Sequence, residues 1–157
     1  MYLAFSGGKD STVLMHLCEM IKPDIKCVFM NTGCEYPDIV HFVRKCQSQG
    51  HNIDIIRPKM TPRQVWSKYG FPLASKEIAE NVRCIRMNPN TVKSKKALGI
   101  INPTAMFGLR DKYRYLIDEI YDTSNKCCDK LKKEPSHRIA KLYGLAPIIG
   151  TMTDESM

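Results

Sequence analysis

A glycine-rich loop near the amino terminus stands between an apolar run and an amphipathic one. Residues 2–5 are apolar, residues 6–12 read Ser-Gly-Gly-Lys-Asp-Ser-Thr, and apolar side chains then recur at helical spacing as far as Ile21. This order predicts a strand, a tight loop and a helix. Glycines let a loop backbone approach an anion closely, and the first N–H groups of a helix favour negative charge. The segment therefore predicts a phosphate-binding loop, the alternative being an ordinary glycine-rich turn.

Each residue of the loop has an expected role in binding phosphate. The predicted binding set is Ser6, Gly7, Gly8, Lys9, Asp10 and Ser11. Both glycines are expected at positive φ, Lys9 supplies a point charge, and the serines supply hydroxyl donors. Because Asp10 repels phosphate, we expect it either to cap the helix or to hold a Mg²⁺ ion that rides on the phosphates. Lys9 and Asp10 are the predicted catalytic residues.

The first third of the chain alternates between strand and helix patterns. Strands are expected at residues 2–5, 27–30 and 53–56, and helices at 11–21 and from Pro37 to before Gly50. This alternation predicts an α/β fold with a mostly parallel sheet and right-handed crossovers, a Rossmann-like three-layer sandwich. In such sheets ligands bind at the carboxyl ends of the strands, where the glycine-rich loop lies.

The rest of the chain is expected to form short helices. One is predicted to start at Thr61-Pro62 and to end at Gly70. The others are predicted at residues 76–87, 110–121, 126–134 and 136–143, the last two separated at Pro135, and a final strand is predicted at 147–150. Residues 88–109 show no strong period. With no linker or repeat in the sequence, residues 1–157 are expected to be a single nucleotide-binding domain.

Three further blocks accompany the loop in order. They are Asn31-Thr32-Gly33-Cys34-Glu35-Tyr36-Pro37-Asp38, then Cys127-Cys128-x-x-x-Lys132-x-x-Pro135, then Gly150-Thr151-Met152-Thr153-Asp154-Glu155-Ser156. Together the four blocks resemble the phosphoadenylylsulfate (PAPS) reductase family, within the adenine-nucleotide α-hydrolase superfamily of PP-loop ATP pyrophosphatases. The resemblance implies an adenine-nucleotide-binding protein that acts on ATP or an adenylylated sulfate, as an oxidoreductase or as a transferase or pyrophosphatase. Gly150 joins the predicted nucleotide-binding set.

The block after the second strand also predicts nucleotide contacts. Thr32 and Gly33 follow that strand at the sheet end that carries the phosphate loop. They can present backbone groups to adenine or ribose, although a plain turn between strand and helix uses Thr-Gly equally well. Their position beside the loop favours binding.

Seven cysteines are scattered along the chain and are expected to be reduced. In iron–sulfur members of the family, an adjacent pair supplies two of four cluster ligands, and a later Cys-x-x-Cys supplies the others. The sequence holds no such later pair. Cys127 and Cys128 are therefore expected to be either half of an incomplete iron–sulfur set or a pair of reactive or structural thiols.

Two departures from the family pattern bear on catalysis. Met152 stands where the family has an arginine that grips the anion, and the sequence lacks the family's later sulfonate-attacking cysteine. We therefore expect this chain alone not to reduce an adenylylated sulfate. We also expect the sheet to be cut short at its carboxyl-terminal edge, which leaves an edge open to a homo-oligomer.

The formal net charge of +8 favours anionic partners, unless it forms only a solvated basic face. Nucleic acid is thus a second expected partner, and the alternative functions are sulfur transfer to tRNA or DNA and a non-catalytic nucleotide-binding module. Apolar runs are too short to span a membrane, so the expected location is the cytoplasm.

Overall fold

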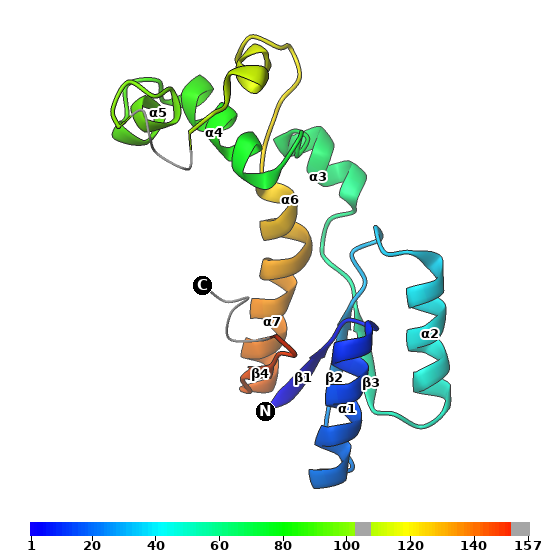
Figure 1. Cartoon of the computed structure of the whole chain (residues 1–157). Helices are drawn as coiled ribbons and strands as arrows, with labels where there is room; N and C mark the ends of the chain where they lie inside the picture. Colours follow the sequence, from blue (N-terminus) through cyan, green and yellow to red (C-terminus); the bar gives the residue numbers. More distant parts are fainter. Residues whose placement is uncertain (103–107, 152–157) are drawn as a thin grey trace. The chain divides into compact units, whose positions relative to one another are not determined.

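The computed structural model describes residues 1–102 and 108–151 (Figure 1). The chain forms two compact units: unit 1 comprises Met1–Thr61 with the segment from Leu131 onward, and unit 2 comprises Pro62–Lys130. The single domain over residues 1–157 stays a prediction. Met152 and the residues after it lie outside the described residues, so the expectations about them are not addressed.

A four-stranded parallel sheet forms the centre of unit 1. Its strands are β1 (Tyr2–Phe5), β2 (Cys27–Met30), β3 (Ile53–Ile56) and β4 (Pro147–Ile148). The strand order is β3-β2-β1-β4, and every pair is parallel. β4 is a short edge strand that pairs Pro147 with Tyr2 and Ile148 with Leu3. Pairing of this edge with another chain stays a prediction.

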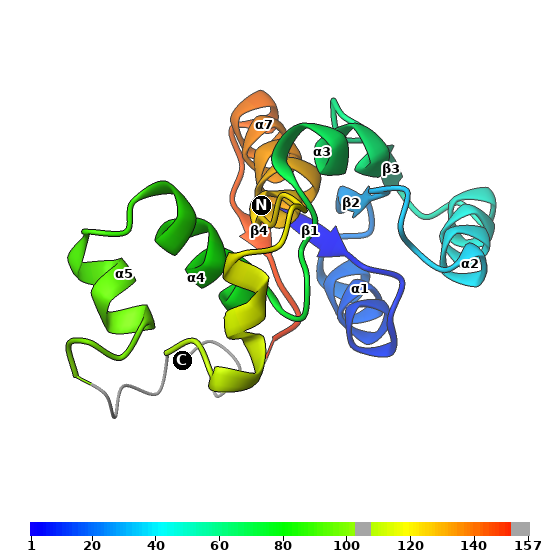
Figure 2. The ribbon, with the colours of Figure 1, turned by 90° about the horizontal axis from the view of Figure 1, so that it is seen from above.

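Helices cover both faces of this sheet. Helices α1 (Lys9–Ile21) and α2 (Pro37–Ser48) lie on one side and α7 (Glu134–Tyr143) lies on the other (Figure 2). Successive side chains of β1 pack on opposite faces of the sheet, because side chains alternate in direction along a strand. Leu3 packs in the cluster with α1 and α2, whereas Tyr2 packs with Ile139 of α7. The predicted Rossmann-like three-layer sandwich is confirmed.

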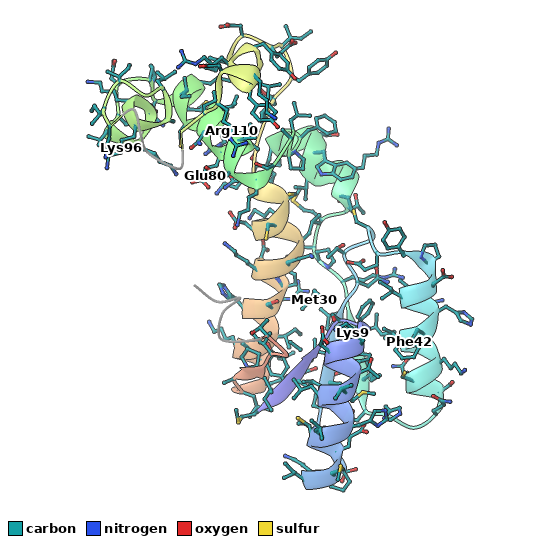
Figure 3. All side chains as sticks on the ribbon, in the orientation of Figure 1. Lys9, Met30, Phe42, Glu80, Lys96 and Arg110 are labelled. Carbon is teal, nitrogen blue, oxygen red and sulfur yellow. The ribbon has the colours of Figure 1, made fainter. Side chains whose placement is uncertain are left out.

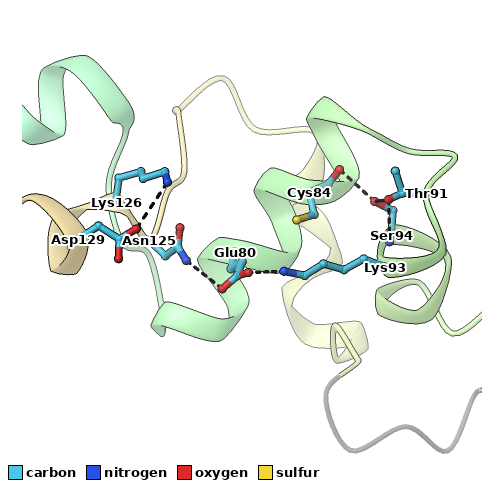
Figure 4. A network of polar contacts seen from close by, with 8 residues as sticks. All are labelled: Glu80, Cys84, Thr91, Lys93, Ser94, Asn125, Lys126 and Asp129. Atoms are coloured by element: carbon cyan, nitrogen blue, oxygen red, sulfur yellow. Dashed lines mark hydrogen bonds and ion pairs between the residues drawn. The ribbon is translucent and has the colours of Figure 1, made fainter. Parts of the chain in front are cut away.

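Unit 2 consists of short helices. They are α3 (Pro62–Tyr69), α4 (Lys76–Met87), α5 (Val92–Ala97), the 3₁₀ helix η1 (Asp111–Ile117) and α6 (Lys126–Cys128). Val82 and Ile85 of α4 form a core with Ala97, Leu109 and Leu116. Polar contacts complete the packing: Glu80 pairs with Lys93 and accepts a hydrogen bond from Asn125 Nδ2 at 2.9 Å (Figure 4).

The predicted helix at 110–121 is wrong in type and length. The structure has a 3₁₀ helix over Asp111–Ile117. The guanidinium of Arg86 donates hydrogen bonds to the backbone carbonyls of Leu116, Ile117, Glu119 and Tyr121. These carbonyls are thus satisfied by a side chain from another helix, so the segment can turn away from helical geometry after Ile117.

The predicted break at Pro135 is also wrong. Helix α6, the π-helix η2 (Asp129–Lys133) and α7 follow one another without interruption, and Pro135 lies in the first turn of α7. A proline ring clashes with the carbonyl four residues earlier in an α-helix, and a wider π turn relieves that clash. The hydroxyl of Ser136 donates to the carbonyl of Lys132 at 2.8 Å, which satisfies a group the altered turn frees.

Sequence patterns missed α5 because six residues are too few to establish a helical period. Within the described ranges, none of the helices combines the length and apolarity needed to cross a membrane.

Candidate nucleotide-binding site

Ser11 organises the glycine-rich loop from within. Its side chain is buried, with 6% of the residue exposed. The Ser11 hydroxyl donates to the carbonyl of Gly8 at 3.0 Å and accepts from the Ser6 amide at 3.2 Å. The Ser6 hydroxyl lies 2.9 Å from it, and since Ser11 has one proton, Ser6 is the donor of that bond. Both hydroxyl protons are therefore used inside the loop, which leaves backbone N–H groups and lysine as phosphate donors.

The two glycines of the loop have different reasons to be glycine. Gly7 has φ +75°, and a Cβ there would lie 2.9 Å from Ile39 Cγ2 of α2. Gly8 has φ −84°, and a Cβ there would meet only the Ser6 hydroxyl, at 3.5 Å. The prediction of positive φ at both glycines is thus wrong for Gly8. Gly8 is also the residue that caps α1, so the expectation that Asp10 forms the cap is wrong.

Lys9 and Asp10 form an exposed ion pair at the start of α1. Lys9 Nζ lies 2.6 Å from Asp10 Oδ1, and the side chains are 88% and 69% exposed. Figure 3 shows Lys9 at the end of α1 that adjoins the loop. Because pairs this exposed contribute at most about 1 kcal/mol, either partner can move toward a ligand at little cost.

The turn after β2 holds Glu35. Thr32 is 4% exposed and donates its hydroxyl proton to Glu35 Oε1 at 2.7 Å. The Gly33 amide donates to Glu35 Oε2 and to Asn31 Oδ1, each at 3.1 Å. The predicted nucleotide contacts at Thr32 and Gly33 are thus engaged within the turn, and the carboxylate that they orient is a residue that sequence reasoning missed.

A cavity of about 490 Å³ lies at the carboxyl ends of β1 and β2. Ala4, Val28 and Met30 give it an apolar wall, and the loop gives it a polar one. Of the predicted binding residues, the cavity is lined by Ser6, Gly8, Asp10, Ser11 and Gly150, whereas Gly7, Lys9, Thr32 and Gly33 lie outside its lining. Its volume is within the usual range for small-molecule sites.

The carboxyl-terminal part of unit 1 also lines this cavity. Gly150 lies against the first turn of α1, since a Cβ on it would be 3.4 Å from Leu14 Cδ2 and 3.6 Å from the Asp10 carbonyl oxygen. Lys132 and Ser136 also line the cavity. Lys132 belongs to the Cys-Cys-x-x-x-Lys-x-x-Pro block, but the sequence alone links it to the cysteines and not to the loop.

The charges on the cavity wall are mixed. Asp10 and Glu35 are acidic and Lys132 is basic. The two carboxylates are oxygen ligands of the kind that Mg²⁺ prefers. Across residues 1–102 and 108–151, no three His, Cys, Asp or Glu side chains converge as a metal centre, so the iron–sulfur prediction for Cys127 and Cys128 has no support in the geometry.

All seven cysteines are free thiols. Cys27 is fully buried, and burial together with the nearby Glu19 carboxylate raises the pKa of its thiol to about 11. Burial also raises the pKa of Cys46. Cys34 is exposed but does not line the cavity, and the lining contains no cysteine.

Comparison with known proteins identifies the family. A family model described as the phosphoadenosine phosphosulfate reductase domain matches residues 1–114, which include the loop and the turn after β2. The uncharacterized protein MJ0973 of Methanocaldococcus jannaschii is 43% identical over 42 residues, which are 27% of this chain and 10% of that protein. The chain thus spans a small part of this relative. On the family match, the chain belongs to the phosphoadenosine phosphosulfate reductase domain family, whose members bind adenylylated nucleotides.

Proposed function

We propose that this chain binds ATP or an adenylylated sulfate in the cavity of unit 1. One observation carries the proposal: the Ser6–Ser11 loop, within the region that matches the family, contributes the polar part of the lining of a cavity of about 490 Å³ that also has apolar lining residues. An adenine nucleotide needs both kinds of surface, because its base is flat and apolar on its faces and its phosphates are anionic.

The phosphates are assigned to the loop and to the first turn of α1. The first N–H groups of a helix have no partner within the helix, and the helix dipole adds to their attraction for an anion. Lys132 lines the cavity and supplies positive charge, and Lys9, which lies outside the lining at the start of α1, is assigned a second positive charge on the phosphates. The adenine is assigned to the wall formed by Ala4, Val28 and Met30.

A Mg²⁺ ion carried on the phosphates suits Asp10 and Glu35, the two carboxylates of the cavity. Bound there, it would neutralise phosphate charge. The proposed role of the chain's own residues is to position the nucleotide and to stabilise charge on its phosphates.

Titration with ATP and with adenylylsulfate tests the site. Gly8→Val should weaken binding more than tenfold, because the valine side chain would take up space in the cavity. The loop should still fold, since the backbone φ of residue 8 suits any residue. Lys9→Ala should weaken binding several-fold. Lys22→Ala is the matched control, since Lys22 is exposed at the other end of α1. Unchanged affinity in both loop variants, with folding intact by circular dichroism, would contradict the proposed site.

The products distinguish the chemistry. AMP with pyrophosphate indicates attack at the α-phosphate, whereas AMP with sulfite indicates two-electron reduction by a thiol. We expect no sulfite above background from adenylylsulfate with thioredoxin supplied, because no cysteine lines the cavity. Sulfite release that is lost in Cys34→Ser would overturn this expectation.

A further inference from the structure

The positive charge of the chain is concentrated in unit 2. Residues 62–130 contain 13 Lys and Arg against 7 Asp and Glu, a formal charge of +6 out of +8 for the whole chain. The rest of the chain contains 11 Lys and Arg against 9 Asp and Glu, a formal charge of +2. The proposed nucleotide site lies in unit 1, so it does not account for the basic side chains of unit 2.

Part of this charge lines a hollow of about 340 Å³. The hollow lies between the end of α5 and the start of η1, and its basic side chains are Lys96, Arg110 and Arg114. Lys96 and Arg110 are labelled in Figure 3. The amide of Leu109 donates to the Ala97 carbonyl at 2.8 Å, which fixes Arg110 next to the end of α5. Among the described residues that line the hollow, Asp111 is the single acidic one.

The basic residues of the hollow are not equally compensated. Arg114 Nε lies 2.9 Å from Asp111 Oδ1, and Arg114 Nη2 donates to the Leu98 carbonyl at 3.3 Å. Arg114 is therefore held in place and neutralised. The side chains of Lys96 and Arg110 form no ion pair or hydrogen bond with any other residue that the structure describes. Lys96, near the carboxyl end of α5, interacts favourably with the helix dipole. This interaction does not explain why Arg110 lines the same hollow.

A second hollow of about 230 Å³ adjoins the first, and the two share Gly108 and Arg110. Tyr113 lines this second hollow together with the acidic Glu77, and Lys112 Nζ lies over the Tyr113 ring, 5.0 Å from its centroid. Proteins that bind single-stranded nucleic acids combine aromatic rings with a basic groove. The bases stack on the rings, and the phosphates pair with the cations. The two hollows together exceed what a single phosphate ion would fill.

We propose that Lys96 and Arg110 bind a phosphate group of a nucleic-acid backbone, with a neighbouring base placed against Tyr113. The arginine fork matches two phosphate oxygens, and the lysine adds a mobile point charge. The site is independent of the nucleotide site in unit 1.

Fluorescence anisotropy of a labelled 12-nucleotide single strand tests this proposal with the full chain at 50–200 mM salt. Lys96→Glu combined with Arg110→Glu should weaken binding more than tenfold. It should also reduce the slope of log affinity against log salt by about 0.7, the value for one phosphate contact on a single strand. Arg63→Glu with Lys76→Glu is the matched control, since it changes the charge of unit 2 equally on α3 and α4 and should weaken binding less than threefold.

Three results would overturn the proposal. One is equal loss of affinity in both double variants, which indicates a general effect of charge. Another is the absence of wild-type binding at 50 mM salt. The third is inorganic pyrophosphate binding at Lys96 and Arg110 more tightly than the strand, which assigns the hollow to a small phosphorylated molecule instead. ATP binding by the Lys96→Glu, Arg110→Glu variant should be unchanged, which separates this test from that of the nucleotide site.

Discussion

The two units of the chain are stabilised in different ways. Unit 1 is built on parallel strands whose side chains are buried on both faces, and its core residues come from a sheet and the helices that cover it. Unit 2 has short helices, and side chains such as Arg86 and Glu80 join their ends. The comparison shows that a regular sheet follows from local sequence patterns, whereas an assembly of short helices depends on contacts between distant residues.

The largest expected loss of stability comes from replacing Gly70, a tightly packed glycine of unit 2. Gly50, a glycine of unit 1 with open space around it, is the comparison. Gly70 has φ +94°, and a Cβ there would lie 2.3 Å from the Asp122 carbonyl oxygen. Gly70→Ala should destabilise unit 2 by about 4 kcal/mol or more. Gly50→Ala, at φ +101° with no atom within 4 Å, should cost only the backbone strain of about 1 kcal/mol.

Urea unfolding measures this difference. Trp66 is the single tryptophan and stacks on Phe71 at 6.0 Å between ring centroids, so its fluorescence follows unit 2. Far-ultraviolet circular dichroism follows the helices of both units and therefore also detects the effect of Gly50→Ala in unit 1. Equal destabilisation by the two substitutions would show that the contact between Gly70 and Asp122 does not limit the stability of unit 2.

Arg86→Met tests the side-chain contacts of unit 2. The substitution leaves the carbonyls of Leu116, Ile117, Glu119 and Tyr121 without their donor, and it should destabilise unit 2 by about 3 kcal/mol. Arg83→Met on the same helix is the control, with an expected cost below about 1 kcal/mol. A small effect of Arg86→Met, read from Trp66 fluorescence, would mean that water replaces the guanidinium at these carbonyls.

The corresponding test in unit 1 is Tyr143→Phe. The Tyr143 hydroxyl donates to Asp54, and this hydrogen bond, with burial, raises the pKa of Tyr143 to about 12. Because the folded pKa is raised, the stabilisation is fully present below pH 10 and is lost as pH rises toward 12. The variant should be less stable than the wild type by about 1 kcal/mol at pH 8, and the difference should shrink above pH 10. A difference that does not change with pH would contradict this account.

Unit 2 should show the opposite pH dependence. The hydrogen bond from Lys93 lowers the pKa of Glu80, so the stabilisation is present above the usual glutamate pKa and is lost as pH falls through the folded value. Both side chains are partly exposed, so Glu80→Gln should cost only about 0.5 kcal/mol at pH 7 and nothing once Glu80 is protonated. Urea midpoints at pH 7 and at decreasing pH test this, and an effect that does not decrease as pH falls would contradict the assignment to the Lys93 contact.

Sequence patterns predicted the strands and the loop of unit 1 because those features are local. Short apolar runs mark β1, β2 and β3, and Ser6–Ser11 follows the first of them directly. Glu35 and Lys132 were missed as cavity residues, because only the tertiary fold brings them to the loop. The 3₁₀ helix after Arg110 depends in the same way on Arg86, a residue about 30 positions earlier in the chain.

Hydrogen exchange of the full chain with saturating ATP tests most directly whether the nucleotide site lies in unit 1. Amides of the Ser6–Ser11 loop, the turn at Thr32–Glu35 and the segment around Gly150 should exchange more slowly with ATP than without it. Amides of α4 and α5 in unit 2 should change little. Unchanged exchange in the Ser6–Ser11 loop while ATP is bound, or protection confined to unit 2, would contradict the proposed site.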